Sequence, residues 1–167
     1  MKRIGILSDT HGFLDPRIYQ YFSECDEIWH AGDWGSLEVV NQLINFKPVR
    51  GVWGNIDDVN IRSLFSEHLH FQCEEVSVWL THIGGYPGKY DIKVRPTIFQ
   101  QPPDLFVCGH SHILKVQFDK KLNLLHINPG AAGKYGFHTV QTIVRLEIDG
   151  KKIQNLEVIE LKKKELD

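Results

Sequence analysis

The sequence has no long apolar run. No stretch approaches the roughly 18 consecutive apolar residues that a membrane-spanning helix requires. Near the N-terminus, only five residues separate the basic pair Lys2-Arg3 from Asp9, which is too short for the apolar region of a signal peptide. We therefore expect a cytoplasmic protein that does not enter a membrane.

The sequence also has few cysteines and a net charge close to zero. The three cysteines, Cys25, Cys73 and Cys108, are odd in number and have no CxxC spacing, which argues against a disulfide framework and for a reducing compartment. We expect them to be buried free thiols. The net charge is −2, so the sequence indicates no broad basic surface for nucleic acid or anionic membranes.

The remaining composition is that of an ordinary globular protein, with 42% hydrophobic and 24% charged residues. The 167 residues fit one domain, and no linker, repeat or low-complexity segment divides them. We predict a single domain over residues 1–167, ending in a short charged tail at 162–167 that begins Lys162-Lys163-Lys164.

Two kinds of periodicity alternate in the first third of the chain. Apolar runs at 4–7, 27–30 and 49–53 indicate buried strands, each followed by a polar loop. Helical spacing occurs between them, first in Ile18, Tyr19 and Phe22, and then, after the N-cap Ser36 and before Pro48, in Leu37, Val40, Leu43 and Ile44. This order predicts parallel strands joined by helical crossovers, which is an α/β fold.

From residue 69 the pattern becomes mostly strand-like. Alternating segments at 68–72 and 75–80 indicate neighbouring strands, and a modest helix is predicted at 91–99. Further strands are predicted at 105–108, 114–118, 122–127, 139–148 and 153–161. Turns are predicted at 119–121 and at Asp149-Gly150, which is a strong hairpin signal.

Metal-competent side chains follow five of the predicted strands. Taken singly, Asp33 and Asn55 are more often turn formers, a lone His82 is more often structural, and the pair Asp9 and His11 is as often plain loop polarity. Because ligand sites of open α/β sheets lie beyond the carboxyl ends of the strands, residues at five such ends would converge. The coincidence favours a metal site built from Asp9, His11, Asp33, Asn55, His82, His110 and His112.

The triplet His110-Ser111-His112 strengthens this interpretation. In extended chain, residues two apart face the same side, so both histidines can point to one cluster. The preceding Gly109 would permit a close approach of the backbone. Mixed oxygen and imidazole ligands fit Mn²⁺, Fe, Zn²⁺ or Ni²⁺ better than Ca²⁺, and no thiolate marks a structural zinc site.

These motifs, Asp9-Thr10-His11, Gly32-Asp33, Gly54-Asn55, Thr81-His82 and Gly109-His110-Ser111-His112, resemble those of the calcineurin-like metallophosphoesterase superfamily. The short chain is similar to the single-domain YfcE-like phosphodiesterases, which also resemble a scaffold subunit of the retromer coat. The resemblance implies two facing mixed β-sheets flanked by helices, a four-layer α/β/β/α sandwich with a dinuclear metal site at one edge.

The resemblance also implies an assignment of ligands. One ion would be bound by Asp9, His11, Asp33 and His112, and the other by Asp33, Asn55, His82 and His110. Asp33 would bridge them, because the two oxygens of a carboxylate can hold both ions at the roughly 3.5–4 Å separation of two-metal sites. The resemblance favours Mn²⁺ as the metal.

The expected chemistry is phosphoester hydrolysis. Two cations would lower the pKa of a bridging water, and the hydroxide would attack phosphorus in line. Asp33, Asn55 and His82 would act in catalysis through the metals. Many members of the superfamily have a histidine directly after the metal-binding asparagine, where this chain has Ile56. Because isoleucine cannot protonate a leaving group, efficient cleavage of monoesters with alkoxide leaving groups is not expected. YfcE-like relatives also lack this histidine, so the resemblance implies a preference for phosphodiesters.

Two other histidines could replace that acid. His30 lies three residues before Asp33, and His138 follows the turn at 128–130, which resembles a family loop near the metals. Histidines in such places more often orient ligands or pack. His68, His70 and His126 are expected to be structural.

The expected partner is a small phosphorylated substrate, with a nucleotide as one option. The alternatives are a non-catalytic protein-binding scaffold of the same fold and a phosphomonoesterase or pyrophosphate hydrolase. A homo-oligomer is also left open. The loops expected to wall the substrate crevice are 13–16, 34–35 and 84–90.

Overall fold

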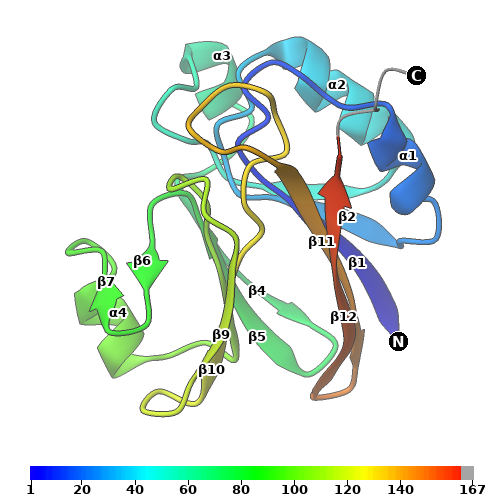
Figure 1. Ribbon diagram of the computed structural model, residues 1–167. Coiled ribbons are helices and arrows are strands. Elements are labelled where there is room, and N and C mark those ends of the chain that lie inside the picture. Colours follow the sequence, from blue (N-terminus) through cyan, green and yellow to red (C-terminus); the bar gives the residue numbers. More distant parts are fainter. Residues whose placement is uncertain (163–167) are drawn as a thin grey trace.

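The computed structural model describes residues 1–162. The predicted tail at 162–167 therefore lies outside the described residues, except for Lys162, which is exposed. Two five-stranded sheets face each other (Figure 1). The first has the order β12 (Lys152–Leu161), β11 (Gln141–Asp149), β1 (Lys2–Leu7), β2 (Glu27–His30) and β3 (Val49–Gly51). The second has the order β4 (His68–Cys73), β5 (Val76–Thr81), β8 (Leu105–Val107), β10 (Leu124–Asn128) and β9 (Lys115–Asp119).

Both sheets are mixed. In the first, β1, β2 and β3 are parallel, and β11 pairs antiparallel with both β1 and β12. In the second, β5, β8 and β10 are parallel, and β4 and β9 form antiparallel edges. The predicted parallel unit at the start of the chain is confirmed, as are two facing mixed sheets.

The main core lies between the sheets. Alternation along β1 directs Ile4 and Ile6 into this core and leaves Leu7 on the opposite face. The second sheet contributes residues such as Val78 and Leu80. Burying a side chain of this size stabilises the fold by roughly 1.5–3 kcal/mol. The driving force for folding is thus concentrated in apolar residues and not in the candidate ligands.

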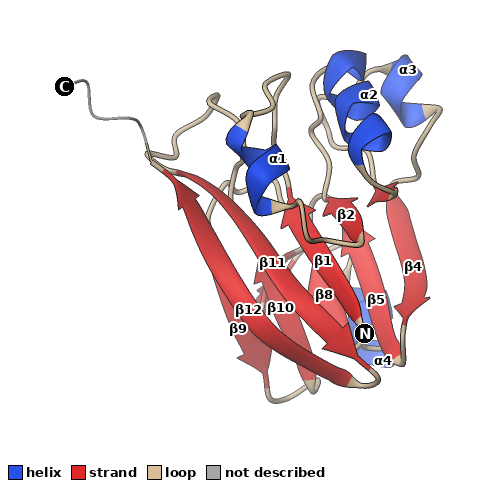
Figure 2. Ribbon diagram, turned by 90° about the vertical axis from the view of Figure 1, so that its right-hand side faces the viewer, coloured by secondary structure: helices blue, strands red, loops and turns tan. Residues whose placement is uncertain are grey.

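Helices cover the outer faces of both sheets. On the first sheet, α1 (Arg17–Tyr21), α2 (Leu37–Phe46) and α3 (Val59–Arg62) share a second apolar cluster. On the second sheet, α4 (Arg95–Gln100) and the hairpin β6 (Gly85–Tyr86) and β7 (Lys89–Tyr90) enclose a third. In the turned view, α1, α2 and α3 lie above the strands, whereas α4 lies behind the lower part of the second sheet (Figure 2). The layers follow the expected α/β/β/α order.

Helix α2 shows how the sequence sets one element. The Ser36 hydroxyl accepts a hydrogen bond from Val39 N, as the N-cap prediction requires. The buried face consists of Val39, Val40 and Leu43. The predicted face also included Leu37 and Ile44, but these are 39% and 51% exposed. The helix instead turns Val39 toward the sheet, beside Val40 and Leu43.

Other segments differ from the sequence prediction in their limits. The helix predicted at 91–99 begins at Arg95, because residues 91–94 form a turn in which Asp91 O accepts from Val94 N. The short helix α3, whose N-cap is Asp58, and the hairpin β6–β7 were not predicted. Elements of two to four residues are too short to show a hydrophobic period.

The three cysteines are buried and free, as expected. Burial raises the pKa of Cys25 and Cys73 to about 11 and that of Cys108 to about 12, so these thiols stay protonated and unreactive at neutral pH. Among residues 1–162, no helix is long and apolar enough to cross a membrane.

Candidate metal centre

The candidate ligands meet at one edge of the two facing sheets. Parallel strands end at the same edge, as the matching directions of β1 and β2 show (Figure 2). Asp9 follows β1, Asp33 follows β2, and Asn55 follows β3. From the second sheet, His82 follows β5 directly, and the loop after β8 carries His110 and His112. The convergence predicted from five strand ends is therefore present.

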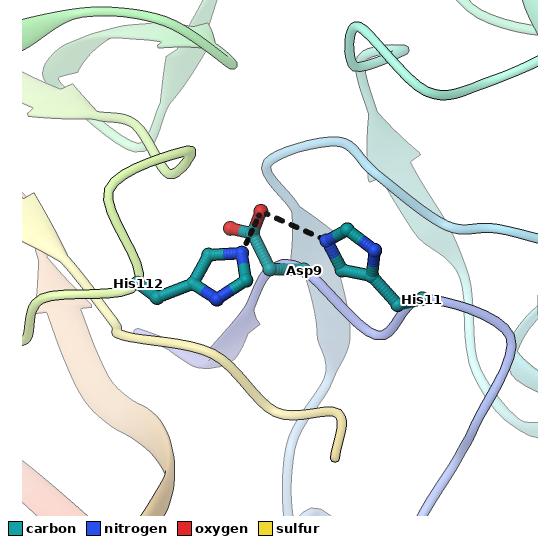
Figure 3. Close-up of side chains that lie close together, drawn as sticks. All are labelled: Asp9, His11 and His112. Carbon is teal, nitrogen blue, oxygen red and sulfur yellow. Dashed lines mark ion pairs between the residues drawn. The ribbon is translucent and has the colours of Figure 1, made fainter. Parts of the chain in front are cut away.

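The first group consists of Asp9, His11 and His112, whose ligand atoms lie within 4.8 Å of one another. Asp9 Oδ1 is 3.1 Å from His112 Nε2 and 3.7 Å from His11 Nε2. Figure 3 shows both imidazoles turned toward this carboxylate, one from each side. The group offers one carboxylate oxygen and two imidazole nitrogens.

The second group consists of Asp33, His82 and His110, also within 4.8 Å of one another. Asn55 joins them, since its Oδ1 is 3.0 Å from both His82 Nε2 and His110 Nδ1. His110 is exposed while Asp33 and His82 are buried. The group therefore opens to solvent on the side of His110.

Asp33 lies between the two groups. Its Oδ2 is 3.4 Å from His11 Nε2 in the first group and 3.2 Å from His82 Nε2 in the second. Its other oxygen, Oδ1, accepts a hydrogen bond from Ile56 N at 3.1 Å. Of the two carboxylate oxygens, Oδ2 therefore faces both groups.

Unsatisfied buried atoms test whether the site fits a cation. Asp9 Oδ1 and His11 Nε2 are buried and make no hydrogen bond within the described residues. The other oxygen, Asp9 Oδ2, accepts from Ser8 Oγ at 2.6 Å and from His110 N at 3.1 Å. Unpaired buried polar atoms are costly unless a partner satisfies them. A divalent cation would do so, and the oxygen and imidazole donors suit Mn²⁺, Fe, Zn²⁺ or Ni²⁺.

Backbone conformation marks the same positions. Within residues 1–162, eight non-glycine residues have a positive φ, and five of them are candidate ligands: Asp9, His11, Asp33, His110 and His112. Left-handed backbone is unfavourable for residues with a side chain and persists where the surrounding structure enforces it. Its concentration at these residues supports a functional site. Gly109 also packs as predicted, since a Cβ there would collide with Ser8 and Asp9.

Further contacts fix which imidazole nitrogen faces each group. His82 Nδ1 donates to Ala31 O at 2.7 Å, which leaves Nε2 as the free lone pair. His138 Nε2 donates to Gly133 O at 2.6 Å, so its Nδ1 accepts from His112 Nδ1 at 3.2 Å and leaves His112 Nε2 free. Such partners commonly orient metal-binding histidines.

Asn128 holds the loop of the histidine triplet. It is buried, and its Nδ2 donates to Gly109 O at 3.0 Å and to Ser111 Oγ at 3.1 Å. Sequence reasoning placed the turn at 128–130 near the site but gave Asn128 no role. The available signal was an amide residue at the end of a predicted strand.

Charges in the site are strongly coupled. Burial would raise the pKa of Asp9 and Asp33, but the neighbouring histidines outweigh it and hold both carboxylates ionised. In return, close contact with Asp33 and then Asp9 raises the pKa of His11 to about 9. The carboxylates are thus ready to bind cations, whereas His11 must first lose a proton.

His30 lies behind the site. It is fully buried, stacks on Trp34 with ring centroids 3.7 Å apart, and has both nitrogens engaged. Gly32 N donates to its Nδ1, and its Nε2 donates to Thr10 Oγ1 at 3.1 Å. Burial lowers the pKa of His30 to about 3, so the ring is neutral. These contacts fit packing and orientation, and they disfavour proton donation to a substrate.

The three histidines expected to be structural lie outside the two ligand groups. His68 Nδ1 contacts Thr81 Oγ1 at 2.9 Å, and His70 packs on Trp79. His126 is fully buried and neither ring nitrogen has a hydrogen-bond partner in the described chain.

Comparison with known proteins agrees with the geometry. Residues 1–151 match the calcineurin-like phosphoesterase superfamily domain. A probable metallophosphoesterase from Methanothermobacter thermautotrophicus is 29% identical over 157 residues, which cover 90% of this chain and 88% of the relative.

Solved structures show the same fold. A protein described as a novel archaeal phosphodiesterase matches with a TM-score of 0.73 and 22% identity, covering 95% of this chain and 99% of its own. Vps29 from Chaetomium thermophilum matches with a TM-score of 0.80 and 13% identity, covering 99% and 88%. With its sequence match, its sandwich of two sheets and its two ligand groups, this chain belongs to the calcineurin-like phosphoesterase superfamily of metal-dependent phosphoesterases.

Proposed function

We propose that this protein hydrolyses phosphodiesters with two divalent cations. The observation that carries the proposal is Asp33 Oδ2, which faces His11 in one ligand group and His82 in the other. One ion would be held by Asp9, His11, Asp33 and His112, and the other by Asp33, Asn55, His82 and His110. Mn²⁺ is our first choice, with Fe, Zn²⁺ and Ni²⁺ as alternatives.

When bound, the two cations would supply Lewis acidity toward the phosphoryl oxygens and make water a nucleophile near neutral pH. The chain itself supplies the geometry. Asp33 is fixed by the bond from Ile56 N to its Oδ1, which leaves Oδ2 facing His11 in one ligand group and His82 in the other. Asn55 supplies a neutral oxygen and adds no charge to the site. The exposed His110 lies on the side from which a substrate can approach.

A cleft beside the second group supports a diester substrate. It has a volume of about 320 Å³ and begins at Asn55 and His82. Two basic residues, Arg62 and Lys93, line it together with two acidic ones, Glu67 and Asp91. Because these charges balance, the cleft suits an uncharged organic group of a diester better than a second phosphate.

The leaving group lacks an evident proton donor. Ile56 is 46% exposed at the position after Asn55 and has no titratable group. His30 is enclosed, and both nitrogens of His138 are occupied by His112 and Gly133. A substrate with a good leaving group needs no such donor. This favours diesters with stable leaving groups, such as aryl diesters, over alkyl monoesters.

The proposal can be tested with Mn²⁺-supplemented hydrolysis of three probes: bis(p-nitrophenyl) phosphate, p-nitrophenyl phosphate and pyrophosphate. We expect the diester to be turned over fastest, and Asp33→Ala to abolish turnover while circular dichroism shows a folded protein. If Asp33→Ala keeps more than about a tenth of the wild-type kcat, an effect under about 1.4 kcal/mol, the bridging role is wrong. Faster cleavage of either other probe would replace the diester assignment.

A second candidate is a protein-binding scaffold, for which the likeness to Vps29 is the specific observation. The complete set of candidate ligands supports the enzyme over this alternative. A wild-type protein that binds two ions yet cleaves none of the three probes would favour the scaffold. Localisation of the protein in cells would test the proposed cytoplasmic location, and sedimentation would test whether it forms the homo-oligomer that the sequence leaves open.

A further inference from the structure

A buried carboxylate outside the ligand groups joins the two loops that carry Asp33 and Asn55. Asp57 is 4% exposed and accepts four backbone hydrogen bonds. Its Oδ2 accepts from Asp33 N at 3.0 Å, Trp34 N at 3.2 Å and Gly54 N at 2.8 Å, and its Oδ1 accepts from Gly35 N at 3.0 Å. Within residues 1–162 it forms no salt bridge. Its charge is therefore met by backbone amides, which are strong partners for a carboxylate.

The bonds between the two loops are reciprocal. Asp57 Oδ2 accepts from the amide of Asp33, and the Asp33 carboxylate accepts from Ile56 N. The loop that carries Asn55 thus sets both the backbone and the side chain of Asp33. Asp33 has a φ of 59°, a conformation that needs support from its surroundings.

The chain also leaves little room for adjustment here. Gly54 lies against Asp33, where a Cβ would overlap the Asp33 carboxylate. Arg62 secures the outer side of the loop, since its Nε donates to Asp57 O at 2.8 Å. Two-metal sites require ligands held to within about 0.5 Å. A single buried group that ties Asp33 to Asn55 meets this requirement.

We propose that Asp57 is a positioning residue that holds Asp33 and Asn55 at the spacing needed to bind the second ion. This inference rests on the proposed two-metal function but concerns a residue that binds neither metal nor substrate. Of these two residues, the second ion would be bound by both, whereas the first would be bound by Asp33 and not by Asn55. Loss of Asp57 should therefore weaken binding of the second ion more than binding of the first.

The test is a calorimetric titration of metal-free protein with Mn²⁺ alone. Asp57→Asn removes the charge and turns an NH₂ group toward amide donors. We expect the affinity for one of two ions to fall about 10–100-fold, the usual effect of losing such an orienting group, with the other ion changed less. Asp58→Asn is the matched control, because the exposed Asp58 accepts from Asn60 N and Ile61 N and only caps α3. It should leave the melting temperature nearly unchanged, because asparagine caps a helix as well as aspartate does, and leave both affinities within twofold.

The outcomes separate the two levels of the proposal. Wild-type affinities in a folded Asp57→Asn protein would overturn the positioning role alone. An equal loss at both ions, or the same loss in Asp58→Asn, would also overturn it. If Asp57→Asn does not fold, Asp57→Glu, which keeps the charge but shifts it by one methylene, is titrated in the same way. Failure of both to fold would show that Asp57 serves the fold as a whole and refute the proposal. A wild-type protein that binds no Mn²⁺ would instead refute the proposed metal centre, and the positioning role with it.

Discussion

Metal binding should strengthen steeply as the pH rises, because protons compete for His11. The contacts with Asp33 and Asp9 raise the pKa of His11 from 6.5 to about 9 in the metal-free protein. At pH 7 the imidazole is therefore protonated in about 99% of molecules, and its lone pair is blocked. The apparent affinity for the first ion should be about 100-fold lower at pH 7 than its limit above pH 9, because it falls about tenfold for each pH unit below 9.

The assay is a Mn²⁺ titration at pH 7.0, 7.5 and 8.0 under nitrogen, in two buffers with different ionisation enthalpies. About one proton should be released from His11, and a further fraction from His82. Burial lowers the pKa of His82, but its contact with Asp33 outweighs this and raises the pKa. His11→Asn is the control, because asparagine tolerates the φ of 46° found at this position and does not titrate. It should bind more weakly, with a much smaller dependence on pH.

The stability of the metal-free protein should depend on pH in the opposite direction to the metal affinity. A histidine whose pKa is raised by folding stabilises the metal-free protein fully below pH 6.5, and this contribution is lost as the pH rises through about 9. Bound metal stabilises more as the proton leaves. The gain in melting temperature on adding Mn²⁺ should therefore increase from pH 7 to 9. Equal Mn²⁺ affinities at pH 7 and 8, or an unchanged slope in His11→Asn, would refute this reasoning.

Three further predictions address other parts of the molecule. His110→Ala and His112→Ala should each lower metal content, but at different ions, and anomalous diffraction that showed the same ion missing in both would contradict the ligand assignment. Ile56→His should flatten the dependence of log(kcat/KM) on leaving-group pKa, with a gain below the 10²–10⁴-fold of a well-placed acid; a wild-type slope that is already shallow would count against a missing acid. Burial lowers the pKa of His126 to about 4 from 6.5, so the wild type should lose stability as the pH falls below 6.5, by about 3 kcal/mol at pH 4. His126→Leu should lack this part of the acid sensitivity in urea unfolding, and an unchanged pH dependence would show that His126 is not responsible.

Much of the architecture could be predicted because its signals are local. Strand β1 is a short apolar run that stops at a polar loop, and α2 has a serine N-cap and a following proline, so both were located from the sequence. The convergence of ligands then follows from parallel pairing, which brings the carboxyl ends of β1, β2 and β3 to one edge. These steps need only periodicity and topology.

The rest depends on contacts between distant backbone groups. Asp57 is important because amides of residues 33–35 point at it, and an aspartate that binds amides looks no different in sequence from its exposed neighbour Asp58. The use of Asp33 Oδ2 for both groups has the same origin, since the bond from Ile56 N decides which oxygen is free. The stacking of His30 on Trp34 likewise depends on the three-dimensional path of the loop after β2 and has no signal in the sequence.

The left-handed backbone at the five ligand positions lowers the stability of the fold in order to place the metal ligands. Each such residue costs of the order of 1–3 kcal/mol, so together they approach the roughly 5–15 kcal/mol by which a typical domain is stable. Glycine would adopt the same conformation without the cost. A directed-evolution screen that rewarded heat resistance alone should therefore enrich glycine at positions such as 11 and 112. It would erase the metal centre while leaving both sheets in place, so a thermostabilised version of this protein has to be selected for bound metal at the same time.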